Sequence, residues 1–448
     1  MFRRLLIANR GEVAARVVRT ARRLGIEPVV VASTADQDQA WLADAAEVVV
    51  IGPPRAAESY LDQAAILEVA RRTRCAAIHP GWGFLAENDV FAARCAAAGV
   101  TFVGPSPSHI RAMGDKDLAR RTMRDLGLDP IPGSRDALPD VATARRVADE
   151  VGYPVLLKAV SGGGGRGMRA VDAPGELAGA YAQAQAEATS AFGDGRLYLE
   201  RRIQKGRHVE VQVIADAWGN VVVLGERECS LQRRHQKVVE EGPSPGLSDE
   251  ERGRILPRVA EAIRASGYTN AGTVEMLLDQ DGRMWFMEMN TRLQVEHPVT
   301  ELLTGVDLVE LQLMVAAGAP LPLTQADVQP KGHAIECRIN AEDPADGFRP
   351  CPGTVSTLRL PEGEGVRVDT HLSAGDRIPP FYDAMVAKVL TWGPDRPAAL
   401  QRMRDALART EVGGVTTNLA LHQQILSWKP FVDGHYDVTS LESDLLGA

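Results

Sequence analysis

Apolar runs alternate with amphipathic segments along the first hundred residues. The runs that predict strands are residues 3–8, 28–32, 47–51, 76–79 and 101–103. A period of about 3.6 residues at 59–72 and 89–98 predicts helices between them. Because strands that alternate with helices pair in parallel, we predict a doubly wound α/β unit here. Its first strand–helix turn lacks the G-x-G-x-x-G pattern, which argues against a dinucleotide site.

A glycine-rich segment, Ser161 to Met168, follows further along the chain. It lies between two predicted strands, 153–159 and 168–171, where a dinucleotide fold or a Walker loop would need a helix. Glycines so placed form a flexible flap whose exposed N–H groups can close over phosphates. Lys158 stands at the root of this flap and would add a point charge. We expect a phosphate-binding lid, with a disordered glycine turn as the alternative.

An acidic β-hairpin is predicted at residues 273–290, where two apolar-rich runs flank Asp281-Gly282, a strong two-residue turn signal. Counting back from that turn places Glu275 opposite Glu288, and like charges so placed repel unless a cation lies between them. Asn290 projects from the same face as Glu288. Two carboxylates and an amide oxygen form a hard site suited to Mg²⁺ or Mn²⁺. The alternative is a solvated acidic strand face.

The rest of the chain contains a basic segment, a strand that carries Arg338, and four further predicted helices. Residues 225–237 form a basic, histidine-containing segment that we interpret as a strand and loop for anion contacts. After a proline-rich linker at 320–330, strict alternation at 332–340 predicts a strand with Arg338 on one face. Further helices are predicted at 141–151, 249–266, 396–410 and 418–428.

Composition narrows the classes of partner. The chain has 448 residues, a net charge of −9 and five scattered cysteines. The acidic balance argues against nucleic acid or an anionic membrane as a partner, and no apolar run reaches the roughly 20 residues of a membrane span. Scattered cysteines and a short apolar N-terminal segment fit a reduced cytoplasmic protein without a signal peptide. Only seven of 50 basic residues are lysines, and three of these lie in the polar or glycine-rich motifs: Lys116, Lys158 and Lys237.

Taken together, these motifs make the chain resemble the biotin carboxylase component of biotin-dependent carboxylases, in the ATP-grasp superfamily. The resemblance runs from Leu6 to Met385. Its most specific stretches are Tyr153 to Met168, Glu288 to Pro298 and Gly81 to Asn88. The family usually has tyrosine where this chain has Trp82. The resemblance implies that this difference alters how the biotin ring is flanked.

The resemblance implies an α/β protein of three parts. These are a Rossmann-like N-terminal domain at 1–113, an ATP-grasp region at 114–327 with its lid at about 131–203, and an α+β C-terminal domain at 328–448. The implied ATP contacts are Lys116, Lys158, Gly163, Gly164, Gly165, Glu200, His208, Gln232 and His235. The implied metal ligands are Glu275, Glu288 and Asn290, in agreement with the hairpin register. The implied bicarbonate and biotin contacts are Arg292, Gln294, Val295, Arg338, Trp82 and Gly83. The implied catalytic residues are Glu296, Arg292, Arg338 and Lys237.

The implied reaction joins ATP, bicarbonate and biotin, by way of carboxyphosphate, to give carboxybiotin, ADP and phosphate. We expect two metal ions, Mg²⁺ or Mn²⁺, to screen the phosphates. Arg292 offers a fork that matches bicarbonate, and Glu296 is the expected base. An ordinary glutamate has a pKa of about 4.3 and is a weak base, so Glu296 needs burial to raise its pKa, or proton transfer concerted with bond formation. Arg338 would stabilise the enolate-like oxygen of biotin.

The resemblance also implies partners. We expect biotin on a separate biotin carboxyl carrier protein, since no lysine follows a methionine and the chain ends at Ala448. Carboxyltransferase subunits would complete an acetyl-CoA carboxylase for fatty acid biosynthesis, and the chain is expected to form a cytoplasmic homodimer. Two alternatives remain: another ATP-grasp ligase, such as a carbamoyl-phosphate or purine-pathway enzyme, and a catalytically silent subunit.

Overall fold

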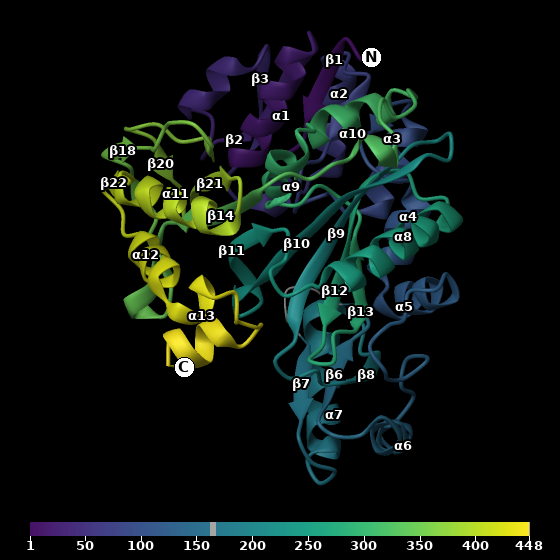
Figure 1. Ribbon diagram of the computed structural model, residues 1–448. Helices are drawn as coiled ribbons and strands as arrows, with labels where there is room; N and C mark the ends of the chain where they lie inside the picture. Colours follow the sequence, from purple (N-terminus) through teal and green to yellow (C-terminus); the bar gives the residue numbers. More distant parts are fainter. Residues whose placement is uncertain (162–166, 448) are drawn as a thin grey trace.

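The N-terminal part of the protein is a parallel sheet with helices on its faces. The computed structural model describes residues 1–161 and 167–447. Five parallel strands lie in the order β3-β2-β1-β4-β5, in the purple N-terminal part at the top of Figure 1. Their bounds are Arg4–Ile7, Glu27–Ser33, Glu47–Gly52, Ala77–His79 and Thr101–Phe102 for β1 to β5. The helices of this part are α1 (Gly11–Arg23), α2 (Gln63–Arg72), α3 (Asp89–Ala97), α4 (Pro107–Gly114) and α5 (Lys116–Asp125). The predicted doubly wound unit is confirmed.

Helix α2 begins four residues later than its periodicity predicted. Asp62 caps it by accepting hydrogen bonds from the backbone N–H groups of Ala64 and Ala65, each at 3.0 Å. A side-chain cap satisfies N–H groups that the first helical turn leaves free, which fixes the start of the helix at Gln63.

A large antiparallel sheet connects the middle of the chain to its C-terminal part. Eight strands lie in the order β13-β12-β9-β10-β11-β14-β21-β19. Their bounds in chain order are Arg207–Ala215 (β9), Val221–Arg233 (β10), Gln236–Gly242 (β11), Asn270–Leu278 (β12), Met284–Asn290 (β13), His333–Asn340 (β14), Val366–Thr370 (β19) and Met385–Gly393 (β21). Strands β11 and β14 pair across the expected domain boundary at 327/328, with Val239 opposite Cys337. One continuous sheet therefore forms the floor on which residues of both parts meet.

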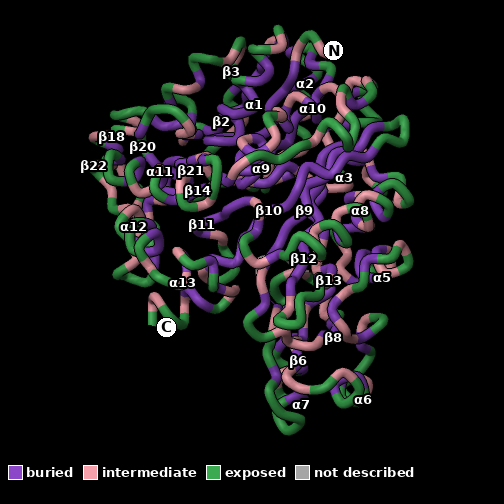
Figure 2. The backbone as a smooth tube through the Cα atoms, in the orientation of Figure 1, coloured by how far each residue is buried: buried purple, intermediate pink, exposed green. Residues whose placement is uncertain are grey.

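Helices cover this sheet, and a separate lobe extends from it. The covering helices are α8 (Asp249–Ser266), α9 (His297–Thr304), α10 (Leu308–Ala316), α11 (Arg396–Ala408), α12 (Leu419–Ser427) and α13 (Lys429–Val432). The lobe contains β6 (Val155–Ala159), β7 (Met168–Val171), β8 (Leu197–Arg201), α6 (Val141–Val151) and α7 (Leu177–Phe192). Short strands β15 to β18, β20 and β22 lie at 342–343, 349–350, 353–354, 357–359, 377–378 and 411–413. In Figure 2 strands β9 and β10 are buried almost throughout, whereas the lobe is largely exposed on its outer side.

The acidic hairpin has the predicted pairing of carboxylates but a different turn. Glu275 lies opposite Glu288, as predicted, while Leu278 pairs with Met284. The backbone N–H of Gly282 donates to the carbonyl of Asp279 at 3.1 Å, and Gly282 has a φ of 78°. The connection is thus a three-residue loop closed by a left-handed glycine. An irregularity between Glu275 and Met276 shifts the register by one residue and restores the predicted pair.

Two further expectations concern membrane and redox chemistry. Among the described residues, no helix has both the length and the apolar character that a membrane crossing needs. All five cysteines lie in the described part of the chain, are free thiols, and four of them are buried.

Candidate active site

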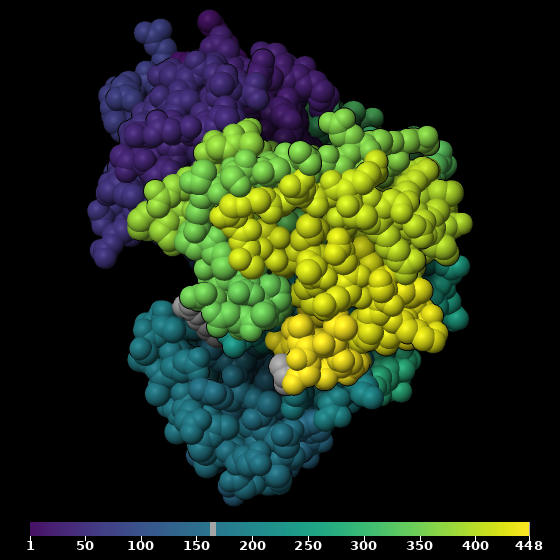
Figure 3. Space-filling view, turned by 90° about the vertical axis from the view of Figure 1, so that its left-hand side faces the viewer, coloured from purple at the N-terminus to yellow at the C-terminus, as the bar shows by residue number. Residues whose placement is uncertain are grey.

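A cleft opens where the lobe faces the C-terminal part of the molecule, and Figure 3 shows this hollow between the teal lobe and the yellow segment. Two adjoining cavities of about 480 and 750 Å³ occupy it. They share six lining residues: Lys158, Met168, His208, Gln232, His235 and Met287. The smaller cavity brings together residues from all three parts of the chain, from Trp82 to Met385.

The predicted metal ligands line the smaller cavity. Glu288 forms an ion pair with Lys116 at the start of α5. The Lys116 charge, opposed by burial, lowers the pKa of Glu288 to about 2. Asn290 donates from its side-chain nitrogen to Glu275 at 2.8 Å, and its amide oxygen accepts a bond from Arg292 at 2.6 Å. Carboxylates on one strand pair are donors that Mg²⁺ prefers, so Glu275 and Glu288 fit the metal. The Asn290 oxygen accepts from Arg292 and has a second lone pair for a further partner.

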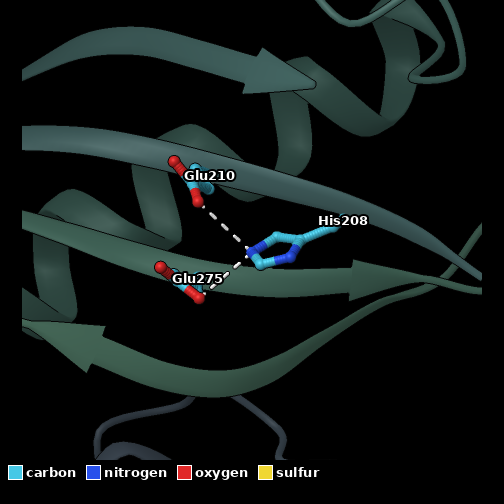
Figure 4. Close-up of side chains that lie close together, drawn as sticks. All are labelled: His208, Glu210 and Glu275. Atoms are coloured by element: carbon cyan, nitrogen blue, oxygen red, sulfur yellow. Dashed lines mark ion pairs between the residues drawn. The ribbon is translucent and has the colours of Figure 1, made fainter. Parts of the chain in front are cut away.

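His208 lies between the buried carboxylates of Glu210 and Glu275 (Figure 4). His208 Nε2 is 3.1 Å from Glu275 and 3.3 Å from Glu210. Burial lowers the pKa of His208, but the two glutamates outweigh it and raise the pKa to about 10. The positive charge that the hairpin register demanded is therefore supplied by protein side chains, His208 at Glu275 and Lys116 at Glu288.

The expected catalytic base lies between two cations. Glu296, the last residue before α9, accepts hydrogen bonds from Lys237 at 2.6 Å and from Arg338 at 2.8 Å. Its side chain is 2% exposed. Lys237 also contacts Glu210, and Arg338 donates from Nε to Glu240 at 2.6 Å. The site alternates fixed positive and negative groups, so each charge has a partner although it is buried.

The electrostatics of Glu296 contradict one expectation. Burial raises its pKa, but the charges of Lys237, Arg338 and Arg227 outweigh burial and lower the pKa below the ordinary value of 4.5. The route in which burial makes Glu296 a stronger base is therefore wrong for this structure.

Arg292 is held at the cleft by a residue that sequence reasoning missed. Its Nε donates to Glu87 at 2.8 Å, and Glu87 also accepts the backbone N–H of Thr291 at 3.0 Å. Glu87 belongs to the Gly81 to Asn88 motif, whose sequence pattern gives this carboxylate no role of its own. The sequence signal that could have identified Glu87 is its position within that motif.

Of the nucleotide contacts expected from sequence, Lys158, Glu200, His208, Gln232 and His235 line the larger cavity, while Lys116 lines the smaller one. Lys158 forms an ion pair with Glu200, and Arg120 donates to the same carboxylate at 2.8 Å. Gln232 lies 2.7 Å from His208 Nδ1, and His235 lines both cavities. The expected lid glycines, Gly163, Gly164 and Gly165, lie outside the described residues.

Trp82 lines the smaller cavity, and its indole N–H is buried without a hydrogen-bond partner among the described residues. Gly83, the next residue, is exposed and does not line either of these cavities. Gln294 does line the cavity, donates to Glu275 at 2.9 Å and accepts from Arg227. Sequence reasoning missed Arg227 and the buried acids Glu210 and Glu240, because a charged residue within a strand usually marks the solvent side.

Comparison with known proteins decides the family. Models of the biotin carboxylase N-terminal domain and C-terminal domain match residues 1–110 and 336–443. The ATP-binding domain of the carbamoyl-phosphate synthase L chain matches residues 115–324. Biotin carboxylase 1 of Bacillus subtilis is 48% identical over 450 residues, 100% of each chain.

The chain belongs to the biotin carboxylase family. It is an ATP-dependent ligase that carboxylates biotin with bicarbonate and uses Mg²⁺ with ATP, so the expected enzyme class and cofactors are confirmed. The match to the carbamoyl-phosphate synthase model covers the shared ATP-binding domain, while the two flanking models set the alternative ligases aside.

Biotin carboxylases serve enzymes with different final substrates. A pyruvate carboxylase subunit of Methanothermobacter thermautotrophicus is 48% identical over 434 residues, which cover 97% of this chain and 88% of that protein. The biotin carboxylase domain dimer of Hydrogenobacter thermophilus 2-oxoglutarate carboxylase, solved with MgADP, ADP and bicarbonate, superposes with a TM-score of 0.95. That domain is 45% identical, and the match covers 99% of this chain and 98% of that one.

Proposed function

We propose that this cleft makes carboxyphosphate from ATP and bicarbonate and passes the carboxyl group to biotin on a separate carrier protein. The observation that carries the proposal is the position of Glu296 between Lys237 and Arg338, in the same cavity as Glu275, Glu288 and the nucleotide-side lysines. A base, two anion-binding cations and a phosphate-binding edge meet within one cleft. This is what a reaction between bicarbonate and a polyanion requires.

ATP would extend from the larger cavity into the smaller one. The larger cavity has apolar lining from Ile131, Leu156, Ile203, Leu277 and Met287, which suits a base ring, and Lys158 stands where the two cavities join. Glu275 and Glu288 would hold Mg²⁺ or Mn²⁺, which neutralises phosphate charge when bound. Lys116 pairs with Glu288 and His208 with Glu275, so each carboxylate also has a cationic side chain beside it. A second ion and a role for Asn290 as ligand are part of the same proposal.

Bicarbonate would bind between Arg292 and Lys237, with Gln294 and the Val295 backbone beside it. Its oxygen attacks the γ-phosphorus, the bond from that phosphorus to the β-phosphate oxygen breaks, and ADP leaves. Glu296 takes the bicarbonate proton in the same step, because the acidity of that proton rises as the new P–O bond forms. The lowered pKa of Glu296 is compatible with a concerted transfer and not with prior deprotonation.

Carboxyphosphate would then break its C–O bond to give CO₂ and phosphate. The phosphate accepts the proton of the biotin ureido nitrogen, and that nitrogen attacks CO₂. Arg338 faces the cavity and would stabilise the oxygen of the biotin enolate. Trp82 and Gly83 would flank the biotin ring, with the larger indole in the place of the tyrosine usual in the family.

For the whole enzyme we propose an acetyl-CoA carboxylase in the cytoplasm, with this chain as a homodimer beside a biotin carboxyl carrier protein and carboxyltransferase subunits. The full-length match to a biotin carboxylase that is a chain of its own supports a separate carrier. The solved 2-oxoglutarate carboxylase domain is a dimer, which supports the homodimer. Pyruvate carboxylation is the second candidate, because a pyruvate carboxylase subunit matches at the same identity.

The test is reconstitution with purified components. ATP cleavage and carboxybiotin formation are measured with free biotin and with a biotinylated carrier, each with and without bicarbonate. We expect the carrier to give the higher kcat/KM, since docking adds binding energy that free biotin lacks. Equal rates with free biotin would contradict the carrier proposal. Adding carboxyltransferases for acetyl-CoA and for pyruvate in parallel then decides between the two final substrates.

A further inference from the structure

A fully buried lysine touches the back of the loop that carries Glu296. Lys388, on β21, is 0% exposed. Its ammonium donates a hydrogen bond of 2.9 Å to the backbone carbonyl of Val295. The carbonyl belongs to the peptide that joins Val295 to Glu296, so this bond fixes the plane of that peptide.

The ammonium also joins the three parts of the chain. It lies 3.1 Å from Glu12, on the N-terminal helix α1, and 3.8 Å from Asp369, on β19 of the C-terminal part. Val295 itself follows the central hairpin. A charge this deeply buried needs partners, and an ammonium has three N–H donors to place. Because Asp369 at 3.8 Å is beyond hydrogen-bond distance, the Val295 carbonyl is one of the acceptors on which the buried ammonium depends.

The neighbouring carbonyl is held in a similar way. His297 is 0% exposed, and its Nδ1 lies 2.7 Å from the carbonyl oxygen of Gln294. Because a carbonyl can only accept, Nδ1 carries the proton. Burial and nearby cations, Lys388 first among them, lower the pKa of His297 well below 6.5, so the ring is neutral and keeps its second nitrogen unprotonated.

Together these contacts give the loop two faces. The carbonyl oxygens of Gln294 and Val295 bind His297 and Lys388, away from the cavity, while the side chains of Gln294 and Glu296 line the cavity. A carbonyl oxygen turned toward bicarbonate would repel it, whereas the opposite edge of a peptide offers an N–H donor. A flipped peptide would thus replace a donor by an acceptor at the anion.

We propose that Lys388 and His297 are positioning residues that hold the Gln294 and Val295 carbonyls away from the cleft and so keep the loop ready for bicarbonate. This inference rests on the proposed function, in which Arg292 to Glu296 bind that anion. Lys388 acts through the backbone and does not contact the substrate. Its predicted effect is on bicarbonate affinity and not on ATP affinity.

The test is the double variant Glu12→Gln with Lys388→Met. It removes one buried negative and one buried positive charge, so the net charge stays the same and no unpaired ion is created at Glu12. The matched control is Glu12→Gln alone, which keeps the ammonium, its carbonyl bond and Asp369. Steady-state KM for bicarbonate, KM for ATP, kcat and the melting temperature are measured for wild type and both variants.

We expect the double variant to raise the bicarbonate KM by about tenfold or more, the loss of roughly one hydrogen bond to a charged group. The ATP KM should stay within about twofold. The control should keep both KM values within about twofold, because it retains the Lys388 ammonium and its bond to the Val295 carbonyl. A lower melting temperature with an unchanged bicarbonate KM would overturn the inference, because Lys388 would then serve stability alone. If the double variant does not fold, His297→Leu is measured instead, with a raised bicarbonate KM as support and an unchanged one as refutation.

Arg292→Gln in the same assay separates the two proposals. If it raises the bicarbonate KM and the double variant does not, the positioning role fails and the proposed site stands. If Arg292→Gln also leaves the bicarbonate KM unchanged, the bicarbonate site itself is misplaced and the positioning inference falls with it.

Discussion

Replacing Glu296 by glutamine tests the proposed base with little change in shape. The amide keeps the volume and can still accept a hydrogen bond from Arg338 or Lys237, but it cannot take a proton. The two cations retain other carboxylates, Glu240 for Arg338 and Glu210 for Lys237. We therefore expect the variant to fold, with loss of function confined to the chemical step.

The size of the loss follows from the role. A positioned general base contributes about 10²- to 10⁴-fold, or roughly 3 to 5 kcal/mol of barrier. Bicarbonate-dependent ATP cleavage by Glu296→Gln should fall by that factor, while the ATP KM stays within about twofold, since the carboxylate is a base and not a nucleotide ligand.

The pH profile gives a second, independent readout. A base must be ionised to work, and the lowered pKa of Glu296 keeps it ionised at every pH above its ordinary 4.5. The wild-type rate should therefore show no acidic limb near neutrality from this group. Burial, opposed by Arg338, raises the pKa of Glu240 to about 7, so a limb near pH 7 would point to Glu240. A Glu296→Gln variant with more than about a tenth of the wild-type rate would refute the assignment.

Three further predictions test other parts of the site and fold. Arg338→Met should lower carboxybiotin formation by about 10²- to 10³-fold, the loss of a charge-stabilising donor, and leave the ATP KM nearly unchanged; an equal loss of ATP affinity would place Arg338 in the nucleotide site. Glu288→Gln should weaken Mg²⁺ binding by about 1.5–3 kcal/mol, so that the Mg²⁺ concentration for half-maximal activity rises roughly 10- to 150-fold. The exposed control Glu68→Gln should leave that concentration unchanged. An unchanged metal titration for Glu288→Gln would remove Glu288 from the metal site. Glu241→Gln should cost about 3 kcal/mol of unfolding free energy at pH 7, because His333 and Arg396 overcome burial and lower the pKa of Glu241 from 4.5 to about 2. This depressed pKa stabilises the fold above pH 4.5, and the difference between wild type and variant should shrink from pH 4.5 toward 2 in denaturant melts; a constant difference would contradict it.

The regular elements could be predicted wherever one face is apolar. The parallel N-terminal sheet follows from its alternating pattern, and helices α6 and α8 have the predicted bounds. The segment 225–237 shows the limit. Its polarity favours a strand with a polar loop, but β10 continues to Arg233, and Glu226, Arg227 and Glu228 are buried within it. Periodicity cannot reveal a strand whose two faces meet a core on one side and an ionic network on the other.

Many residues that line the cleft could be predicted from sequence, whereas their electrostatics could not. The sequence motifs brought Glu275, Glu288 and Glu296 forward, and the structure places all three at one cavity. The direction of the Glu296 pKa depends on Lys237 and Arg338, which come from distant strands, and their distances exist only in the folded protein. The Lys388 contact with Val295 is likewise invisible in the sequence, because the two residues are 93 positions apart.

The most direct test of the account is the fate of an oxygen atom from bicarbonate. If bicarbonate attacks the γ-phosphorus, one of its oxygens stays on phosphorus when carboxyphosphate breaks into CO₂ and phosphate. Turnover with ¹⁸O-labelled bicarbonate, followed by mass spectrometry of the released phosphate, should show one bicarbonate oxygen in each phosphate formed. Phosphate that carries only solvent and ATP oxygens would contradict the proposed carboxyphosphate step.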